Sequence, residues 1–106
     1  MRRFSPRELQ TYLAQSENPP LLLDVREPWE YERCHIEGSE LIPMREVPAA
    51  ATQLDPAQEI VVICHHGIRS RQVAYYLERE GFTNLINLEG GLEAWAQDVD
   101  QTMNRY

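Results

Sequence analysis

The sequence predicts a single α/β domain in which a parallel β-sheet carries helices on both faces. Three observations support this class. Short, mostly apolar runs at 21–25, 60–63 and 85–88 are typical of strands that are covered on both faces. Helical patterns separate these runs, and strands that alternate with helices form parallel sheets with right-handed crossovers. The chain has 106 residues, 42% of them apolar, which suffices for one hydrophobic core and not for two.

The chain opens with a strong signal for a helix. Ser5 is suited to cap it, Pro6 fits its first turn, and Glu8 completes a capping box. Apolar residues then recur from Leu9 at i, i+3 and i+4, which indicates one buried stripe. Asn18-Pro19-Pro20 ends this helix, because successive prolines cannot continue one.

The middle of the chain alternates between strands and short helices. The run at 21–25 predicts a buried strand, and Pro28 opens a short helix. A weak strand is expected at 41–42, followed by a helix over 45–54 that contains Pro48.

The second half of the chain contains the clearest elements. The run at 60–63 is β-branched throughout and has no polar side, so it predicts the most buried strand. Gly81 fits the position just past the end of the helix that follows. The remaining elements are a helix at 70–80, a strand at 85–88, a helix at 92–97 and a polar, loosely docked tail at 98–106, all within one domain that spans 1–106.

Composition excludes several classes of function. A formal net charge of −7 opposes binding to nucleic acid. All 10 basic residues are arginine, which excludes lysine chemistry such as Schiff-base formation. The longest apolar run, 60–64, has five residues, far fewer than the roughly 20 that span a bilayer, so we expect no membrane contact. With two cysteines and no export signal, the expected location is the reducing cytoplasm, and nothing requires more than a monomer.

The segment after the most buried strand contains the candidate chemistry. Cys64 stands at the carboxyl end of that strand, where ligands bind in parallel sheets. The loop His65-His66-Gly67-Ile68-Arg69-Ser70 then returns directly into a helix. Backbone N–H groups in such a loop form an anion-binding nest, which the amino terminus of the helix reinforces. A thiol in that field loses its proton more readily, so the sequence predicts a reactive thiolate. The alternative is a buried structural cysteine.

Arg69 favours the functional interpretation. A cation in the first turn of a helix is destabilised by about 0.3–1 kcal/mol through the helix dipole. An anion at this site would offset that loss, so the broken rule suggests a bound anion. Screening limits the reach of distant carboxylates to about 8 Å, so we expect Arg69 and the loop dipoles to prevail locally.

Four segments together resemble the rhodanese (thiosulfate sulfurtransferase) family. They cover nearly the whole chain in the family's order, and the first two are specific as a pair. The segments are the loop 64–70, the stretch Asp24-Val25-Arg26-Glu27-Pro28-Trp29-Glu30-Tyr31, the stretch His35-Ile36-Glu37-Gly38-Ser39 with Leu41-Ile42-Pro43, and the closing Gly90-Gly91-Leu92-Glu93-Ala94-Trp95. The chain departs from the family at Cys34, where glycine is usual, and at His65, where arginine is common.

The resemblance implies a five-stranded parallel sheet and a sulfurtransferase that needs no cofactor and no metal. Cys64 would take sulfane sulfur from a small anionic donor such as thiosulfate and become a persulfide. It would then pass the sulfur to a thiol, to cyanide in an assay, or to a sulfur-accepting protein. The N–H groups of residues 65–70 would hold the outer sulfur, and Arg69 would attract the sulfonate. Ser70 would either hydrogen-bond the thiolate or cap the helix.

Other residues and functions remain open at this stage. Asp24 and Arg26 would brace the loop or border its mouth, or else form an ordinary surface ion pair, and His35 would hydrogen-bond backbone. Cys34 is most simply a surface cysteine on a short helix, but it could accept sulfur from Cys64 or form a disulfide with it. Cys34 and His35 together with Cys64-His65-His66 could also bind zinc, although the spacing fits no standard zinc pattern. A cysteine-dependent phosphatase or arsenate reductase needs five residues between cysteine and arginine, whereas four separate Cys64 from Arg69. A non-catalytic binding or sulfur-carrier module is the third alternative.

Overall fold

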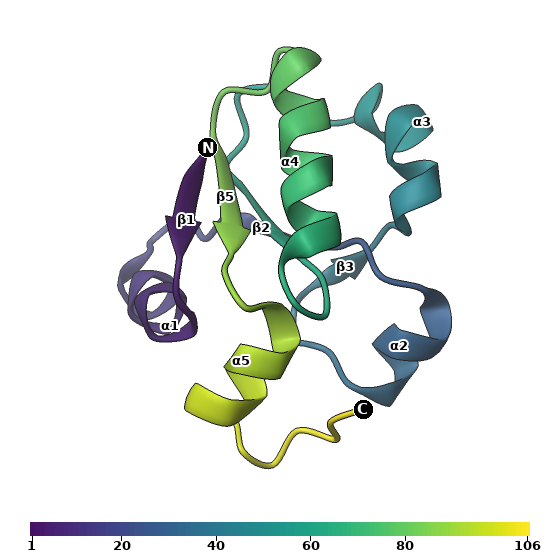
Figure 1. Cartoon of the computed structure of the whole chain (residues 1–106). Helices are drawn as coiled ribbons and strands as arrows, with labels where there is room; N and C mark the ends of the chain where they lie inside the picture. The colour runs from purple at the N-terminus through teal and green to yellow at the C-terminus, as the bar shows by residue number, and fades with distance from the viewer.

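A computed structural model describes residues 1–106 and confirms the α/β class. Five parallel strands form one sheet in the order β1-β5-β4-β2-β3 (Figure 1). The elements are β1 (Arg2–Phe4), α1 (Pro6–Gln15), β2 (Leu21–Asp24), α2 (Pro28–Arg33), β3 (Glu40–Leu41), a 3₁₀ turn (Met44–Glu46), α3 (Val47–Ala51), β4 (Ile60–Ile63), α4 (Ile68–Arg79), β5 (Leu85–Leu88) and α5 (Gly91–Asp98).

The central strand β4 divides the core between the two faces of the sheet. Ile60 and Val62 pack in a cluster with residues of α3 and α4. Val61 and Ile63 pack in a second cluster with residues of α1 and α5. All four side chains are fully buried, which explains why this strand shows no polar side. The carboxyl end of β4 therefore lies in the middle of the sheet, with helices on both sides.

Local signals explain where the main helices begin and end. The capping box of α1 forms as predicted, because Ser5 Oγ accepts from the Glu8 N–H and Glu8 accepts from the Ser5 N–H. Helix α4 ends at Arg79, and Gly81, which follows its C-cap, has a φ of +96°, while the Phe82 N–H donates back to the carbonyl of Leu77 at 3.0 Å.

Three details differ from the sequence prediction. Strand β1 was not expected; it is a short edge strand that pairs only with β5 and is largely exposed, so it has no burial pattern. The helix expected over 45–54 is a 3₁₀ turn followed by α3, and Pro48 lies in the first turn of α3, where its missing N–H costs nothing. Helix α4 begins at Ile68, two residues earlier than expected, directly after Gly67. No helix is long and apolar enough to cross a membrane.

Candidate active site

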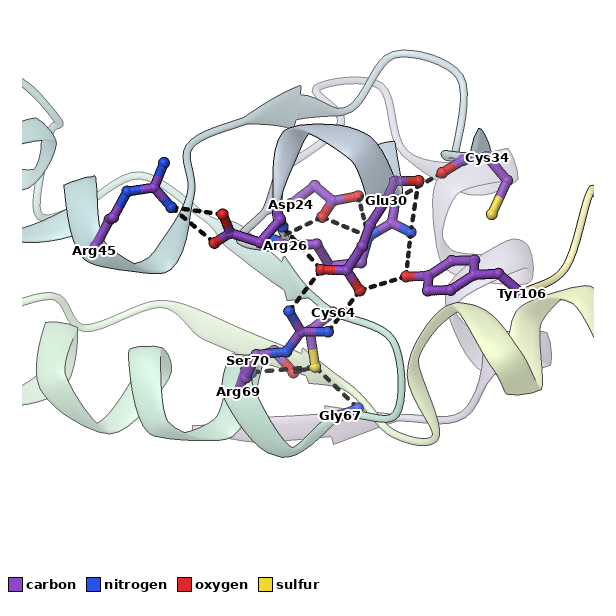
Figure 2. Close-up of polar contacts among 11 residues, drawn as sticks. Asp24, Arg26, Glu30, Cys34, Arg45, Cys64, Gly67, Arg69, Ser70 and Tyr106 are labelled. Carbon is purple, nitrogen blue, oxygen red and sulfur yellow. Dashed lines mark hydrogen bonds and ion pairs between the residues drawn. The ribbon is translucent and has the colours of Figure 1, made fainter. Parts of the chain in front are cut away.

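Cys64 lies directly after β4 and is 1% exposed. The backbone N–H groups of Gly67 and Ser70 point at its Sγ at 3.0 and 3.3 Å (Figure 2). Gly67 has a φ of +94°, which a residue with a side chain rarely adopts. This conformation turns the chain directly from the strand into α4. Because amide dipoles and the amino terminus of α4 converge on it, the sulfur lies in a field that favours negative charge.

The backbone of α5 holds the cysteine loop from the other side. The carbonyl of Cys64 accepts from the Leu92 N–H at 2.9 Å. The carbonyl of His65 accepts from the Glu93 N–H at 3.0 Å. Gly91 makes this approach possible, since a Cβ there would lie 2.5 Å from the Cys64 carbonyl oxygen. Because the carbonyls of Cys64 and His65 bind α5, the backbone groups of the loop that face the sulfur are the N–H groups of Gly67 and Ser70.

Asn87 completes a buried polar network that the sequence analysis did not single out. Ser70 Oγ donates to Asn87 Oδ1 at 2.5 Å and lies 3.3 Å from Cys64 Sγ. Asn87 Nδ2 donates to the Gly67 carbonyl at 3.3 Å and to the Glu89 carboxylate. The hydroxyl proton of Ser70 is thereby committed to Asn87, so its oxygen accepts from the Cys64 thiol. A polar residue within the otherwise apolar strand 85–88 was the available signal.

Arg69 is bound to a carboxylate of the chain itself. Its two terminal nitrogens donate to the two oxygens of Glu30 at 2.7 and 2.9 Å (Figure 2). The Glu30 side chain is 5% exposed and also accepts from the Tyr106 hydroxyl at 2.7 Å and the Glu27 N–H at 2.9 Å. The hydrogen bond from Arg69 lowers the pKa of Glu30 to about 2, despite its burial. The anion that offsets Arg69 in the first turn of α4 is therefore Glu30.

Asp24 and Arg26 form a buried ion pair, which excludes an ordinary surface pair. Both side chains are fully buried, and the guanidinium donates to the Asp24 carboxylate at 2.7–3.1 Å. Arg26 also donates to the carbonyls of Glu30 and Cys34 and to the Tyr106 hydroxyl. Burial opposes its charge, but the hydrogen bonds and attraction of Asp24 outweigh burial and raise the pKa of Arg26. These bonds hold α2 and Tyr106, not residues 64–70, so support of the loop by this pair stays a prediction.

The end of the chain reaches the site, whereas we expected residues 98–106 to dock loosely. The Tyr106 ring stacks on His65 with centroids 4.1 Å apart and meets Trp29 edge to face. Its hydroxyl accepts from Arg26 and donates to Glu30. Burial raises the pKa of Tyr106, so the hydroxyl keeps its proton. Tyr106 thus links the buried ion pair to the carboxylate that binds the loop.

The remaining loop side chains differ in exposure. His65 is half-buried, and burial together with the neighbouring His66 lowers its pKa. Protonation of His65 is therefore less favourable than that of an ordinary histidine, and its ring is not a fixed positive charge. His66 is exposed, and Ile68 is 63% exposed on the surface beside the loop. Neither side chain makes a hydrogen bond to the sulfur.

Cys34 and His35 lie at the end of α2. Cys34 has extended backbone (φ −166°, ψ 147°), which any residue adopts, so this position does not require the usual glycine. Both cysteines are free thiols. His35 Nδ1 lies 2.8 Å from the Tyr31 carbonyl, in agreement with the expected backbone hydrogen bond. No group of three or more His, Cys, Asp or Glu side chains is placed to hold a metal ion.

The fold and the loop define a class of parallel α/β domains with one buried cysteine in an amide-lined loop after the central strand. Comparison with protein families matches residues 5–98 to the rhodanese-like domain. The chain belongs to the rhodanese-like domain family.

Curated relatives and solved structures agree with this assignment. The chain is 43% identical over 74 residues to a putative sulfur carrier protein, YrkF, of Bacillus subtilis, covering 70% of this chain and 40% of that protein. It is 33% identical over 105 residues to a probable adenylyltransferase/sulfurtransferase, MoeZ, of Mycobacterium tuberculosis, covering 97% of this chain and 26% of that protein. A rhodanese-like domain protein from Staphylococcus aureus superposes with a TM-score of 0.84 at 30% identity, covering 100% of this chain and 99% of that one. The chain thus spans less than half the length of these curated relatives, but 99% of the solved S. aureus chain.

Proposed function

We propose that the chain is a sulfurtransferase in which Cys64 carries sulfane sulfur as a persulfide. The observation that carries this proposal is the pair of N–H groups, from Gly67 and Ser70, aimed at a buried thiol sulfur at the end of β4. Such a loop stabilises negative charge on the cysteine before the reaction and on the added sulfur after it. The relatives named as sulfur carrier and sulfurtransferase support the same chemistry.

The proposed reaction is a double displacement at Cys64. With thiosulfate as donor, the thiolate attacks the sulfane sulfur, the donor's S–S bond breaks, and sulfite leaves with the electron pair. The persulfide anion of Cys64 remains, with its outer sulfur in the amide-lined loop. Once this sulfur is protonated, an acceptor thiolate attacks it, the Cys64 S–S bond breaks, and the acceptor leaves as a persulfide while Cys64 returns to the thiolate. No metal or cofactor takes part in either step.

Phosphatase chemistry is the less favoured alternative. A phosphatase loop uses its arginine to bind two oxygens of the phosphate. Here the two terminal nitrogens of Arg69 are occupied by Glu30. The loop is also one residue shorter than that chemistry needs, which favours a single added sulfur atom.

Mass spectrometry after incubation with a sulfur donor tests the proposal. The protein should gain the mass of one sulfur atom, and cyanide or dithiothreitol should remove it. Cys64→Ser should abolish the gain, whereas Cys34→Ser, the matched control at the other free thiol, should retain it. Failure of the wild type to gain sulfur from either thiosulfate or cysteine persulfide overturns the proposal, as does a gain that survives Cys64→Ser. Hydrolysis of an aryl phosphate without sulfur uptake would favour the phosphatase alternative.

Turnover distinguishes an enzyme from a carrier. Repeated production of thiocyanate from thiosulfate and cyanide by catalytic amounts of protein indicates an enzyme. A single loading of Cys64 that is released only to a sulfur-accepting protein indicates a carrier module, as the name of the B. subtilis relative suggests.

A further inference from the structure

The arginines around the cysteine loop are each paired with a carboxylate of the chain. The pairs are Arg69–Glu30, Arg26–Asp24, Arg71–Glu89 and Arg105–Glu93. His65 contributes no fixed positive charge, since burial and His66 lower its pKa. The surroundings of the sulfur therefore offer no unpaired arginine, and the attraction there comes from the loop's N–H groups.

Glu30 is held too firmly for an incoming anion to displace it from Arg69. Four hydrogen bonds reach its carboxylate, from Arg69 twice, from the Tyr106 hydroxyl and from the Glu27 N–H. The side chain is 5% exposed. A donor that took Arg69 for itself would leave a buried carboxylate without its cation, and such an uncompensated charge is strongly unfavourable.

A dianionic donor meets an unfavourable site for this reason. Thiosulfate carries two negative charges, and an anion that approaches Arg69 also approaches Glu30. The guanidinium edge formed by the two terminal nitrogens, one at which an oxyanion can bind in a bidentate manner, already binds Glu30. A hydropersulfide, R–S–SH, presents its sulfane sulfur as a neutral group and needs no cation.

We infer that Glu30 determines donor choice, and that this site takes sulfane sulfur from the persulfide of a thiol in preference to free dianions such as thiosulfate. The inference rests on the proposed function and names its substrate class. In the transfer, the Cys64 thiolate attacks the outer sulfur of R–S–SH. The donor's S–S bond breaks, R–S⁻ leaves with the electron pair, and the proton stays on the transferred sulfur, so that Cys64 becomes Cys64–S–SH. No oxidant or reductant is consumed.

Rates of single sulfur loading test the role of Glu30. We compare thiosulfate with freshly prepared cysteine persulfide, whose reacting R–S–SH form is a zwitterion without net charge, by quenched mass spectrometry. Glu30→Gln should raise the rate constant for thiosulfate at least about tenfold, the equivalent of about 1.4 kcal/mol, because it frees Arg69. The same substitution should raise the rate with cysteine persulfide by a clearly smaller factor than the rate with thiosulfate, because a neutral group gains little from a free cation. Glu32→Gln, the same change on the exposed side of α2, should change both rates less than about twofold.

A double substitution separates the charge of Arg69 from general loosening of the site. In Glu30→Gln/Arg69→Gln the gain for thiosulfate should disappear, since no cation is freed. A gain that persists in the double variant contradicts the inference, and so does a Glu30→Gln protein that keeps its fold and shows no gain.

Ionic strength provides a test on the wild type that does not depend on the folding of any variant. Because the arginines around the cysteine loop are paired and the formal net charge is −7, added salt should leave the thiosulfate rate unchanged or raise it by screening repulsion. A thiosulfate rate that falls steeply with salt would show that a free cation attracts the donor, and would overturn the inference while leaving the proposed function intact. If neither donor loads Cys64, the proposed function itself fails.

Discussion

The buried ion pair between Asp24 and Arg26 predicts a large loss of stability when its negative charge is removed. The Asp24 carboxylate accepts from Arg26 Nε and Nη2 and from the Arg26 backbone N–H, at 2.7–3.1 Å. Asp24→Asn keeps the shape of the side chain but leaves a fully buried guanidinium without its counter-ion. Breaking a buried pair from one side costs about 3–5 kcal/mol. In a domain of this size that lowers the unfolding temperature by at least about 12 °C.

Urea denaturation measures this effect directly. Asp24→Asn should shift the midpoint to lower urea with an unchanged m-value, because the surface exposed on unfolding stays the same. Asp98→Asn is the matched control, since Asp98 is exposed and makes no hydrogen bond through its side chain; its free energy of unfolding should change by less than about 0.5 kcal/mol. A loss of less than about 1 kcal/mol in Asp24→Asn would refute the reasoning, because it would mean that water or a rearranged partner compensates the guanidinium.

Three further predictions concern stability. Because the folded-state pKa of Glu30 is lowered from 4.5 to about 2, its ion pair stabilises the protein above about pH 4.5, and this contribution of at most about 3 kcal/mol is lost as the pH falls towards 2. The stability of Glu30→Gln, measured over the same acid range, should lack this loss. Stability curves of the wild type and the variant that run parallel against pH would contradict the assignment. Ser70→Ala leaves the buried Asn87 Oδ1 without its donor and should cost about 1–3 kcal/mol in urea denaturation, so an unchanged midpoint would disprove the network. Gly91→Ala should destabilise the protein more than Gly81→Ala, because both glycines have positive φ but only a Cβ at Gly91 meets backbone atoms. If the two substitutions lower the unfolding temperature equally, the contact between a Cβ at Gly91 and the cysteine loop is easily relieved.

The sequence predicted those parts of the fold that depend on local patterns of burial. Strand β4 is apolar on both faces because it lies at the centre of the sheet, and the capping box of α1 is complete within four residues. Strand β1 has neither property, since it is an exposed edge strand of three residues held by pairing with β5. Its position depends on a partner more than 80 residues along the chain, and no local pattern records such a partner.

The backbone of the candidate site was also accessible to local reasoning. A cysteine at the end of the most buried strand, followed by Gly67 and a helix, is enough to predict a loop with inward N–H groups. In the structure, the N–H groups of Gly67 and Ser70 point at Cys64 Sγ. The roles of the loop side chains stay predictions. Asn87 was overlooked because strand 85–88 was interpreted only as an element of the core. Its polar side chain in a fully buried strand needed partners, and the side chains of Ser70 and Glu89 are two of them.

Arg69 shows where local reasoning about charge reaches its limit. A cation in the first turn of a helix requires a compensating anion, and Arg69 does bind an anion, the Glu30 carboxylate. The sequence could not say where the anion comes from, since Glu30 lies 39 residues away on α2 and Tyr106 lies 76 residues from Glu30. With the compensating charge supplied internally, Arg69 no longer argues for a bound dianion. The amide dipoles at Cys64 need no such cation to hold one added sulfur atom. The contact between Glu30 and Arg69 therefore argues against a sulfonate site, whereas the N–H groups of the loop still favour a persulfide at Cys64.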